Sequence, residues 1–211
     1  MAKDTSPPAQ PGFDEPTSPP TDPAERLVAA AIAEIEAHGL SQVTVRGIAK
    51  TAGMNVAAVN YHFGSKDALL SAGLDAAIAH MLEDTELLLA RVHDDPHSAL
   101  PDLLAYYLEG SLRYPRISKA HLHGAFSQDD YSGTFPTRFG PVLVRLRDEL
   151  ARAVPGLARD QAARRVVAAI SAILFPAFFA GLFTPLRPLD TPAERLAYAA
   201  EIAAIALMPP R

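Results

Sequence analysis

The amino-acid sequence predicts an all-α protein in which a small three-helix head precedes a larger helical body. Apolar residues recur at helical spacing along most of the chain, and few segments have the composition of β-strands. Proline and glycine separate these stretches at intervals, and two of the helix starts carry capping patterns. A chain of 211 residues, 49% of them hydrophobic and 20% charged, can bury the core that this fold needs.

The first predicted helix follows a proline-rich segment. Residues 1–21 contain six prolines among polar residues, too little apolar surface to order itself, so we predict a disordered tail. In the motif that follows, Asp22 can cap a helix, Pro23 suits its first position, and Glu25 can reach back to the cap. The helix is predicted to end at His38-Gly39, after an apolar stripe of Leu27, Val28, Ala31, Ile32 and Ile35.

The stretch from Thr44 to Lys66 has the pattern of two short helices joined by a glycine turn. Ala49 lets the two helices approach, Gly53 suits the positive φ of the turn, and Val59 locks the second helix onto the first. The second helix presents small and polar groups of the kind that fit a DNA major groove. These groups are Asn55, Val56, Ala57, Ala58, Asn60, Tyr61 and His62. The pattern therefore predicts a DNA-reading element.

The rest of the chain is predicted to be helical. Ser65 caps a helix that runs to about Val92, and breakers delimit further helices at about 97–113, 117–127, 137–153, 159–183 and 191–207. The last of these opens with a capping box, Thr191 to Glu194. We therefore expect a DNA-binding domain over residues 22–75 and a body over residues 76–211.

The head resembles the TetR family of bacterial transcriptional regulators. The resemblance covers about residues 23–73 and is carried by Thr44-Val45-Arg46, Ile48-Ala49, Ala52-Gly53, Val59, and the run from Asn60 to Leu70. It implies a cytoplasmic homodimer whose body binds a small molecule. The expected function is a repressor that a hydrophobic or amphipathic effector releases from a palindromic operator.

Roles for individual side chains follow from the same resemblance. It implies that Arg46 contacts phosphate or a base edge, that Tyr61 and His62 contact phosphate, and that Lys66 clamps the DNA backbone. The groove-facing set also contains Asn55 to Ala58 and Asn60, with Thr44 at the start of the motif. Asn60 stands where the family usually has tyrosine. An amide can bond adenine N6 and N7 together, so we expect Asn60 to read a base directly.

The charge of the head indicates that it acts as one half of a dimer. Residues 24–75 carry four basic and five acidic side chains, so each head can neutralise few phosphates. The helices at about 159–183 and 191–207 are apolar nearly all round, and we expect them to pair across a two-fold axis. The alternative is that they form an internal core pair in a monomer.

Residues for an effector pocket are harder to select, because aromatic residues at helical spacing are more often core. The candidates are those that could give an apolar cavity polar contacts. They are Tyr106, Tyr107, His121, His123, Phe126 and Arg138.

Other classes of protein find little support. The net charge of −5 is not that of a protein that coats DNA non-specifically, and no cysteine is present for disulfides or thiolate metal sites. The uncharged run Val166–Phe183 has the minimum length of a membrane span, but its small residues and Pro176 favour a helix buried between subunits. The start of the chain lacks a secretory signal pattern.

The sequence shows neither an enzyme signature nor the spacing of a metal site. His121 and His123 do not share a helix face with each other, so Asp129 and Asp130 do not complete a metal site. We find no catalytic motif, and we expect neither a cofactor nor enzymatic activity. The main alternative to a regulator is a helical ligand-sensing or protein-interaction module that does not bind DNA.

Overall fold

The computed structural model describes residues 20–186 and 189–210, and within them the ordered elements are all helices. The predicted tail, residues 1–21, lies outside the described residues except for its last two. The elements are α1 (Pro23–His38), η1 (Leu40–Gln42), α2 (Val45–Thr51), α3 (Val56–Phe63), α4 (Lys66–Val92), α5 (Pro96–Arg113), α6 (Pro115–His121), α7 (His123–Gln128), α8 (Thr134–Ala153), α9 (Arg159–Phe178), α10 (Ala180–Phe183), η2 (Thr184–Leu186) and α11 (Pro192–Leu207). This confirms the predicted all-α fold.

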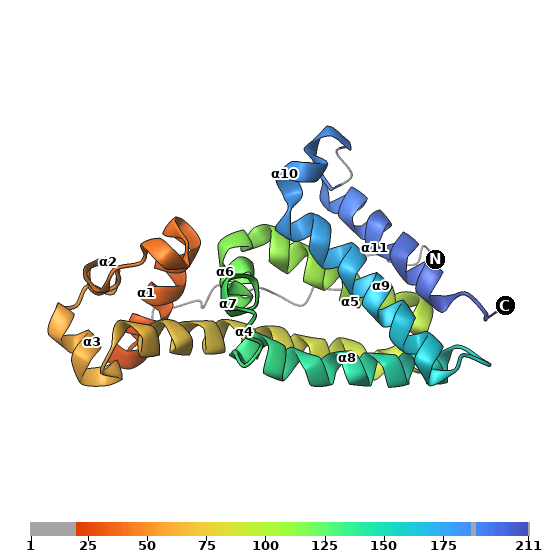
Figure 1. The fold of residues 1–211 in the computed structure, drawn as a ribbon, viewed down its shortest axis with the longest axis horizontal. Coiled ribbons are helices and arrows are strands. Elements are labelled where there is room, and N and C mark those ends of the chain that lie inside the picture. The colour runs from red at the N-terminus through yellow and green to blue at the C-terminus, as the bar shows by residue number, and fades with distance from the viewer. Residues whose placement is uncertain (1–19, 187–188, 211) are drawn as a thin grey trace, which may run out of the picture.

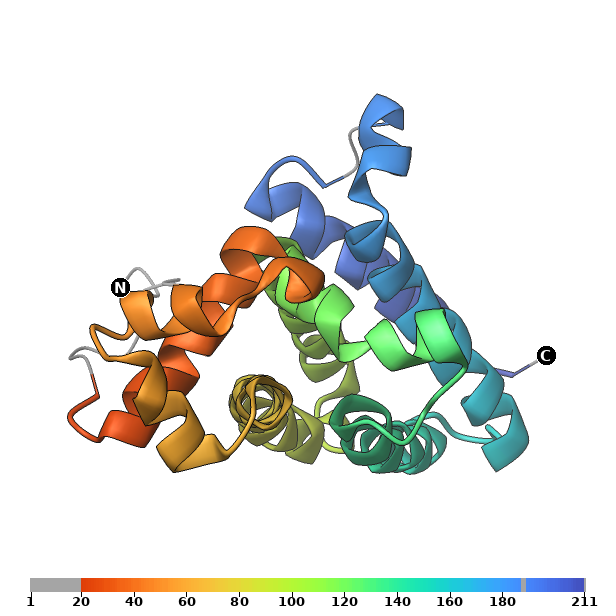
Figure 2. The same ribbon diagram turned by 60° about the vertical axis from the view of Figure 1, so that its left-hand side comes forward.

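The long helix α4 joins the head to the body. Figure 1 shows α1–α3 at one end of the molecule, with α4 running from them along the edge of the body. The body consists of α5, α8, α9 and α11 packed beside the second half of α4. Figure 2 looks more nearly along α4, with the head on one side of it and α8 on the other. The predicted boundary near residue 75 falls inside this continuous helix.

The head has a core of its own, which helix α6 of the body completes. Leu27 and Ile35 of α1 are fully buried, as are Ile48 of α2 and Val59 of α3. The buried residues Ile117 and Ala120 of α6 join the same cluster. A body helix therefore packs directly on the head.

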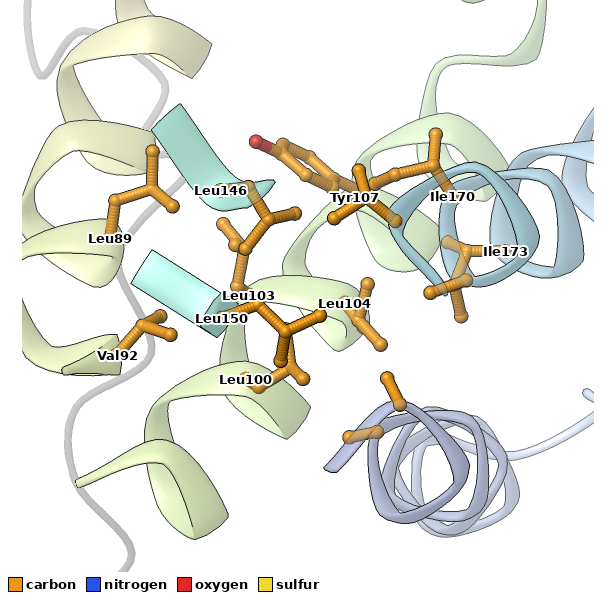
Figure 3. Packing of buried hydrophobic residues seen from close by; sticks show 14 of the residues in the cluster. Leu89, Val92, Leu100, Leu103, Leu104, Tyr107, Leu146, Leu150, Ile170 and Ile173 are labelled. Carbon is orange, nitrogen blue, oxygen red and sulfur yellow. The ribbon is translucent and has the colours of Figure 1, made fainter. Parts of the chain in front are cut away.

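A second core holds the body together. Figure 3 shows Leu89 and Val92 of α4, Leu100 to Tyr107 of α5, Leu146 and Leu150 of α8, and Ile170 and Ile173 of α9 converging. The small residues Ala199 and Ala203 of α11 are also fully buried in this cluster, which lets α11 lie close to α5. Burial of these side chains contributes about 1.5–3 kcal/mol for each large aliphatic one.

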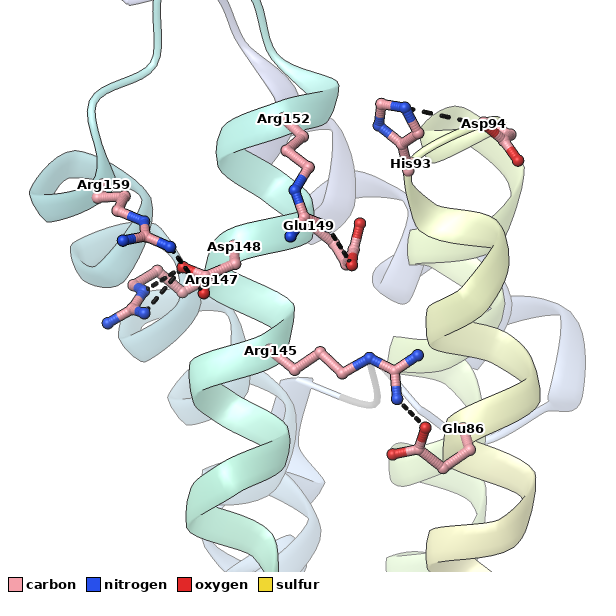
Figure 4. A network of polar contacts seen from close by, with 9 residues as sticks. All are labelled: Glu86, His93, Asp94, Arg145, Arg147, Asp148, Glu149, Arg152 and Arg159. Carbon is pink, nitrogen blue, oxygen red and sulfur yellow. Dashed lines mark hydrogen bonds and ion pairs between the residues drawn. The ribbon is translucent and has the colours of Figure 1, made fainter.

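Ion pairs on the surface fix the position of α8. Arg145 of α8 pairs with Glu86 of α4, and Asp148 pairs with Arg147 and with Arg159 of α9 (Figure 4). These groups are partly exposed, so each pair stabilises the fold by at most about 1 kcal/mol. The Arg145–Glu86 and Asp148–Arg159 pairs link α8 to α4 and α9, whereas the Arg147–Asp148 pair lies within α8.

Two predicted helices are broken in the structure. The helix expected at 117–127 is interrupted at Leu122, whose φ of −104° and ψ of 7° lie outside the helical range, and continues as α7. The helix expected at 159–183 ends at Phe178, and only the short α10 follows. Pro176 lacks an N–H group for the carbonyl of Ala172 four residues before it. The Tyr198 hydroxyl of α11 donates to that carbonyl instead, at 2.8 Å.

Among the described residues, one helix, α9, is long and apolar enough to cross a membrane by length and composition. In this fold it packs between α5, α8 and α11, with 39% of the apolar window buried.

Candidate nucleic-acid interface and cavity

The helix-turn-helix is built by local hydrogen bonds and close packing. Gly53 has a φ of +65°, as predicted, and its N–H donates to the Lys50 carbonyl at 3.0 Å. The N–H of Met54 donates to the Ala49 carbonyl at 2.8 Å, which closes the turn. Ala49 and Val59 are buried where α2 and α3 meet. A left-handed residue at a helix end favours glycine because it has no Cβ.

Three polar side chains cap the N-termini of α2, α3 and α4. Thr44 Oγ1 accepts from the Gly47 N–H at 3.0 Å, Asn55 Oδ1 from the Ala58 N–H at 2.9 Å, and Ser65 Oγ from the Ala68 N–H at 3.1 Å. Each satisfies one otherwise unpaired helix donor. Thr44 and Asn55, both predicted to contact DNA, therefore also have a structural role.

The predicted DNA-facing side chains of α2 and α3 are largely open to solvent. Arg46, Ala57, Asn60 and His62 are exposed, and Val56 is 40% and Tyr61 85% exposed. Ala58 differs, because it is partly buried against the core of the head. Phe63, at the end of α3, also packs on that core. A tyrosine that is 85% exposed is not part of a core, and its ring, which meets the His62 ring edge-on at 4.9 Å, is open to an outside partner.

Lys66 occupies a more enclosed position than its neighbours. It is the first residue of α4 and is partly buried, and its ammonium group donates to the Val43 carbonyl at 3.2 Å. This bond ties the start of α4 to the segment before α2. The positive charge is thereby held beside the N-terminus of α4, where an anion is favoured.

For contact with an anionic partner, the positions of the charges along the head matter more than its net charge. Between residues 37 and 66 the chain has three basic side chains, Arg46, Lys50 and Lys66, and no acidic one. Two acids of the head engage other partners: Glu34 accepts from the Thr51 hydroxyl at 2.7 Å, and Glu36 faces α6. The segment that carries the exposed side chains is therefore positive, although residues 24–75 sum to a net negative charge. The sequence pattern already held this signal, in the absence of carboxylates.

A cavity of about 1320 Å³ lies between head and body. Its walls come from six helices far apart in the sequence, α1, α4, α5, α6, α8 and α9, together with Phe63 of α3. Ala29, Ile32 and Ala33 of the head line one side, and aromatic residues of the body line the other. Anything bound there would contact both parts of the molecule.

Three of the six predicted pocket residues line this cavity and three do not. Tyr106, Tyr107 and His121 are in its wall. His123, Phe126 and Arg138 are not, and all three are exposed, Phe126 by 69%. The break at Leu122 separates α6 from α7, so residues expected on one helix do not share its face. Phe135, Phe139 and Asp84 line the cavity but escaped the prediction, although the Phe pair at i and i+4 indicated a common face.

The aromatic rings in the cavity wall form a continuous row. Phe135 stacks on Phe139 with ring centroids 4.9 Å apart, and Tyr107 meets Phe139 edge-on at 5.4 Å. The His121 ring lies 5.7 Å from Phe135, and Tyr106 lies 6.0 Å from Tyr107. Such a row offers both apolar surface and the negative faces of aromatic rings.

Some polar groups in and beside the cavity have hydrogen-bond partners and others do not. The Tyr106 hydroxyl donates to Asp84 at 2.8 Å, and burial together with this carboxylate raises the tyrosine pKa. Burial lowers the pKa of His121 to about 4, against the opposing influence of the Asp75 carboxylate, so the imidazole is neutral near pH 7. Within the described part of the chain, Asp75 Oδ1 is buried without a hydrogen-bond partner. A buried polar atom without a hydrogen-bond partner is costly.

Reciprocal contacts connect α1 of the head to α6. The Glu36 carboxylate accepts from the backbone N–H groups of Arg116, at 3.2 Å, and Ile117, at 2.9 Å, in the first turn of α6. The Arg116 guanidinium in turn donates to the carbonyls of Glu36, at 3.0 Å, and Ala37 at the end of α1. The end of one helix and the start of the other are thus joined by charge-assisted bonds.

The last helices leave apolar side chains exposed. Val167 and Phe175 of α9 are 66% and 49% exposed, and Leu196 and Ile205 of α11 are 52% and 59% exposed. Leu182 and Leu186, just beyond α9, are 67% and 75% exposed. A concentration of exposed apolar residues on neighbouring helices indicates an interaction surface. Other apolar side chains of α9 and α11 are buried in the body core. Both helices therefore have apolar residues in the core and apolar residues exposed to solvent.

In residues 20–186 and 189–210, no group of three or more His, Cys, Asp or Glu side chains is arranged to hold a metal ion. His121 lies partly buried in the cavity wall and His123 is exposed outside it.

Comparison with known proteins places the head among described regulators. Residues 27–72 match the model for bacterial regulatory proteins, tetR family. An HTH-type transcriptional regulator, BetI, from Stenotrophomonas maltophilia (strain R551-3) is 34% identical over 76 residues. That match covers 36% of this chain and 39% of BetI, so the chain spans about two fifths of the curated relative it matches.

Solved structures extend the likeness of the fold to most of the chain. A transcriptional regulator from Rhodococcus sp. Rha1 superposes with a TM-score of 0.65 at 23% identity, over 87% of this chain and 95% of that one. A TetR transcription regulator from Haloarcula marismortui ATCC 43049 gives a TM-score of 0.65 at 24% identity, over 88% and 96%. At these identities the likeness concerns the fold, including the arrangement of a helix-turn-helix head on a helical body.

Proposed function

Since the chain belongs to the TetR family of bacterial regulatory proteins, we propose that it is a homodimeric repressor released from a palindromic operator by a small-molecule effector. The family places the protein among DNA-binding transcriptional regulators. The finer parts of the proposal, namely the repression, the dimer and the effector, rest on the geometry described above.

The observation that supports DNA reading most directly is the exposed face of α3. Asn60 and Tyr61 stand open to solvent on a helix whose opposite side, through Val59, is locked in the head. In a helix-turn-helix protein the second helix enters the major groove with its exposed side chains toward the bases. The absence of acidic residues between 37 and 66 keeps this face attractive to phosphate.

The exposed apolar surface of α9 and α11 supports dimerisation. A second copy of the chain, related by a two-fold axis, would cover Phe175 and Ile205 with the same residues of its partner. Two heads on one dimer would match two successive major grooves, about 34–36 Å apart. Dimerisation also doubles the small number of phosphate contacts available to one head.

The cavity supports an effector that acts on the head. It is lined by Ala29 and Ile32 of α1 as well as by Tyr107 of α5 and His121 of α6. Because Glu36 and Arg116 tie α1 to α6, a ligand that shifts α6 would also reorient the head. The effector releases DNA only if it binds the two head arrangements with different affinity.

Asn60 gives the proposal a specific test. A mobility-shift assay should show the protein binding DNA from upstream of its own reading frame. Selection from a library of randomised sites should show Asn60→Ala losing preference at one base pair per half-site, worth about 1–3 kcal/mol for a bidentate amide–adenine contact. Ser118→Ala, on α6, is the control and should keep the full preference. Unchanged base preference in Asn60→Ala would contradict this role of the amide.

A further inference from the structure

We propose that Glu34 of α1 is a positioning residue for DNA binding, which holds α2 so that Arg46 and Lys50 face the DNA backbone. The proposal deepens the proposed function and rests on it for the contact with DNA, whereas the hold of Glu34 on α2 is argued from the head alone.

Helix α2 is too short to fix its own orientation. It has seven residues, and an isolated helix of fewer than about 12 residues is marginal in water. Ile48 and Ala49 are buried and anchor α2 to the head. Apolar contacts have no direction, whereas a hydrogen bond has a preferred geometry and restrains the rotation of α2 about its own axis.

Glu34 makes such a bond across the contact between α1 and α2. Its side chain is only 14% exposed, and its Oε1 accepts from the Thr51 hydroxyl at 2.7 Å. Its other oxygen, Oε2, lies against Gly47, where a Cβ atom would come within 2.6 Å of it. Residues 47 and 51 are about one turn apart on the same side of α2. One carboxylate therefore contacts both ends of the face that α2 turns toward α1.

A second charged side chain of α1 holds the end of α2. The Arg26 guanidinium donates to the Ala52 carbonyl at 2.5 Å, directly before the turn at Gly53. Arg26 and Glu34 are about two turns apart on α1, so their side chains leave it on the same side. Helix α2 is thus attached to α1 at two points, and Glu34 is the one that restrains its rotation.

The residues that Glu34 contacts are the neighbours of two basic residues. Arg46 directly precedes Gly47, and Lys50 directly precedes Thr51, and both basic side chains are exposed. Successive residues of a helix are about 100° apart around its axis. A rotation of α2 that separates Thr51 from Glu34 therefore also turns Arg46 and Lys50 away from their present direction.

Two substitutions loosen the contact without changing any charge. Thr51→Val removes the hydroxyl donor, and Gly47→Ala places a methyl group where the carboxylate lies. Fluorescence anisotropy with labelled upstream DNA, at several salt concentrations, should show about tenfold weaker binding for each variant and a smaller slope of log K against log salt.

The controls make the same chemical changes on α8 of the body. Thr134→Val removes a hydroxyl, and Gly140→Ala adds a methyl group where no atom lies within 4 Å. Neither should change the affinity or the salt slope. Unchanged affinity and slope in folded Thr51→Val and Gly47→Ala would overturn the proposal.

A double-mutant cycle tests whether the effect acts through the basic residues. In a protein that carries Arg46→Ala and Lys50→Ala, measured at low salt, Gly47→Ala should weaken binding by less than about twofold further. Its effect is then already lost with the two side chains that it displaces. A full tenfold effect in that background would contradict the positioning role.

Glu34 itself is tested with two variants of equal charge. Glu34→Gln keeps an acceptor for the Thr51 hydroxyl and should retain the salt slope, whereas Glu34→Ala should lower it as Thr51→Val does. Equal slopes in the two variants would show that the hydrogen bond does not position α2. If Glu34→Ala does not fold, Thr51→Val and Gly47→Ala decide.

A measurement without DNA separates this proposal from the proposed function. Hydrogen–deuterium exchange followed by mass spectrometry should show faster exchange in residues 45–51 of Thr51→Val, with α4 unchanged. Faster exchange together with weaker DNA binding supports both proposals. Faster exchange in a protein whose wild type does not bind the upstream DNA contradicts the regulator and leaves the hold on α2 supported. Exchange equal to that of the wild type overturns the positioning by Glu34, whether or not the DNA binds.

Discussion

At the scale of single residues, Lys66 combines an observed structural contact with a proposed contact to DNA phosphate. Its ammonium group bonds the Val43 carbonyl and stands beside the N-terminus of α4. The sequence resemblance predicted a phosphate contact here, and the bond to Val43 explains how a flexible side chain is held in position. Fixing the lysine before DNA arrives reduces the side-chain entropy lost on binding.

Replacing Lys66 with alanine is expected to weaken binding to all DNA sequences alike and to lower the slope of log K against log salt by about 1. Fluorescence anisotropy at several salt concentrations measures both quantities. Lys119→Ala, an exposed lysine on α6, removes the same charge away from the head and should change neither. An unaltered salt slope in folded Lys66→Ala would show that the lysine holds only Val43.

His121 makes the stability of the fold depend on pH. Burial lowers its pKa from 6.5 in the unfolded chain to about 4 in the fold. As the pH falls below about 6.5 the unfolded chain takes up a proton that the folded chain refuses until about pH 4, so stability is lost on acidification. Between pH 7 and pH 5 this amounts to about 2 kcal/mol.

His121→Asn should therefore lose less stability than the wild type over that interval. Urea unfolding at pH 7 and pH 5, at one protein concentration, measures the difference. His123→Asn, at an exposed position, should behave as the wild type does. If His121→Asn and the wild type lose equal stability, the imidazole is not held neutral by burial.

At the scale of elements, the sequence predicted those helix ends and turns that depend on neighbouring residues alone. Asp22, Gly39, Gly53, Ser65 and Thr191 mark helix ends or the turn through their own caps and backbone angles, and the structure places them there. The breaks at Leu122 and Phe179 were missed, because apolar periodicity continues through both. Pro176, three residues before the second break, stays within α9, where Tyr198 of α11 donates to the carbonyl that the proline leaves unpaired.

The proposed pairing of α9 and α11 across a two-fold axis gives a prediction at this scale. Ile205→Glu should raise the dimer dissociation constant about 100-fold or more, since two unpaired carboxylates would enter the interface of each dimer. Analytical ultracentrifugation measures the constant. Leu87→Glu, at a 70% exposed leucine on α4, is the control and should remain dimeric. A tight dimer of Ile205→Glu would move the interface away from α11.

At the scale of the whole molecule, the cavity is the feature that sequence reasoning could not assemble. Tyr106, Tyr107 and His121 were chosen as polar aromatic residues, and the fold brings them together. Phe126 and Arg138 were chosen on the same grounds and lie exposed. The wall also includes head residues, which no single-helix pattern connects to the body. The head, by contrast, was predictable because its motif lies within about 25 contiguous residues.

Helix α1 connects the cavity to the helices of the head that carry the proposed DNA-binding side chains. Ile32 lines the cavity from α1, and the same helix packs its buried face against α2 in the head. At its end, the Glu36–Arg116 contacts hold α6, which also lines the cavity. A ligand in this cavity would therefore contact both the head and the body. This arrangement fits a regulator whose two heads change separation on effector binding.

The central claim is that two such heads read one operator together. Hydroxyl-radical footprinting on the upstream DNA fragment tests it most directly, with the stoichiometry measured on the same complex. We expect two protected half-sites, one dimer per fragment, with centres about 34–36 Å apart along one face of the duplex. A single protected half-site bound by one chain, or uniform protection without position, would contradict it.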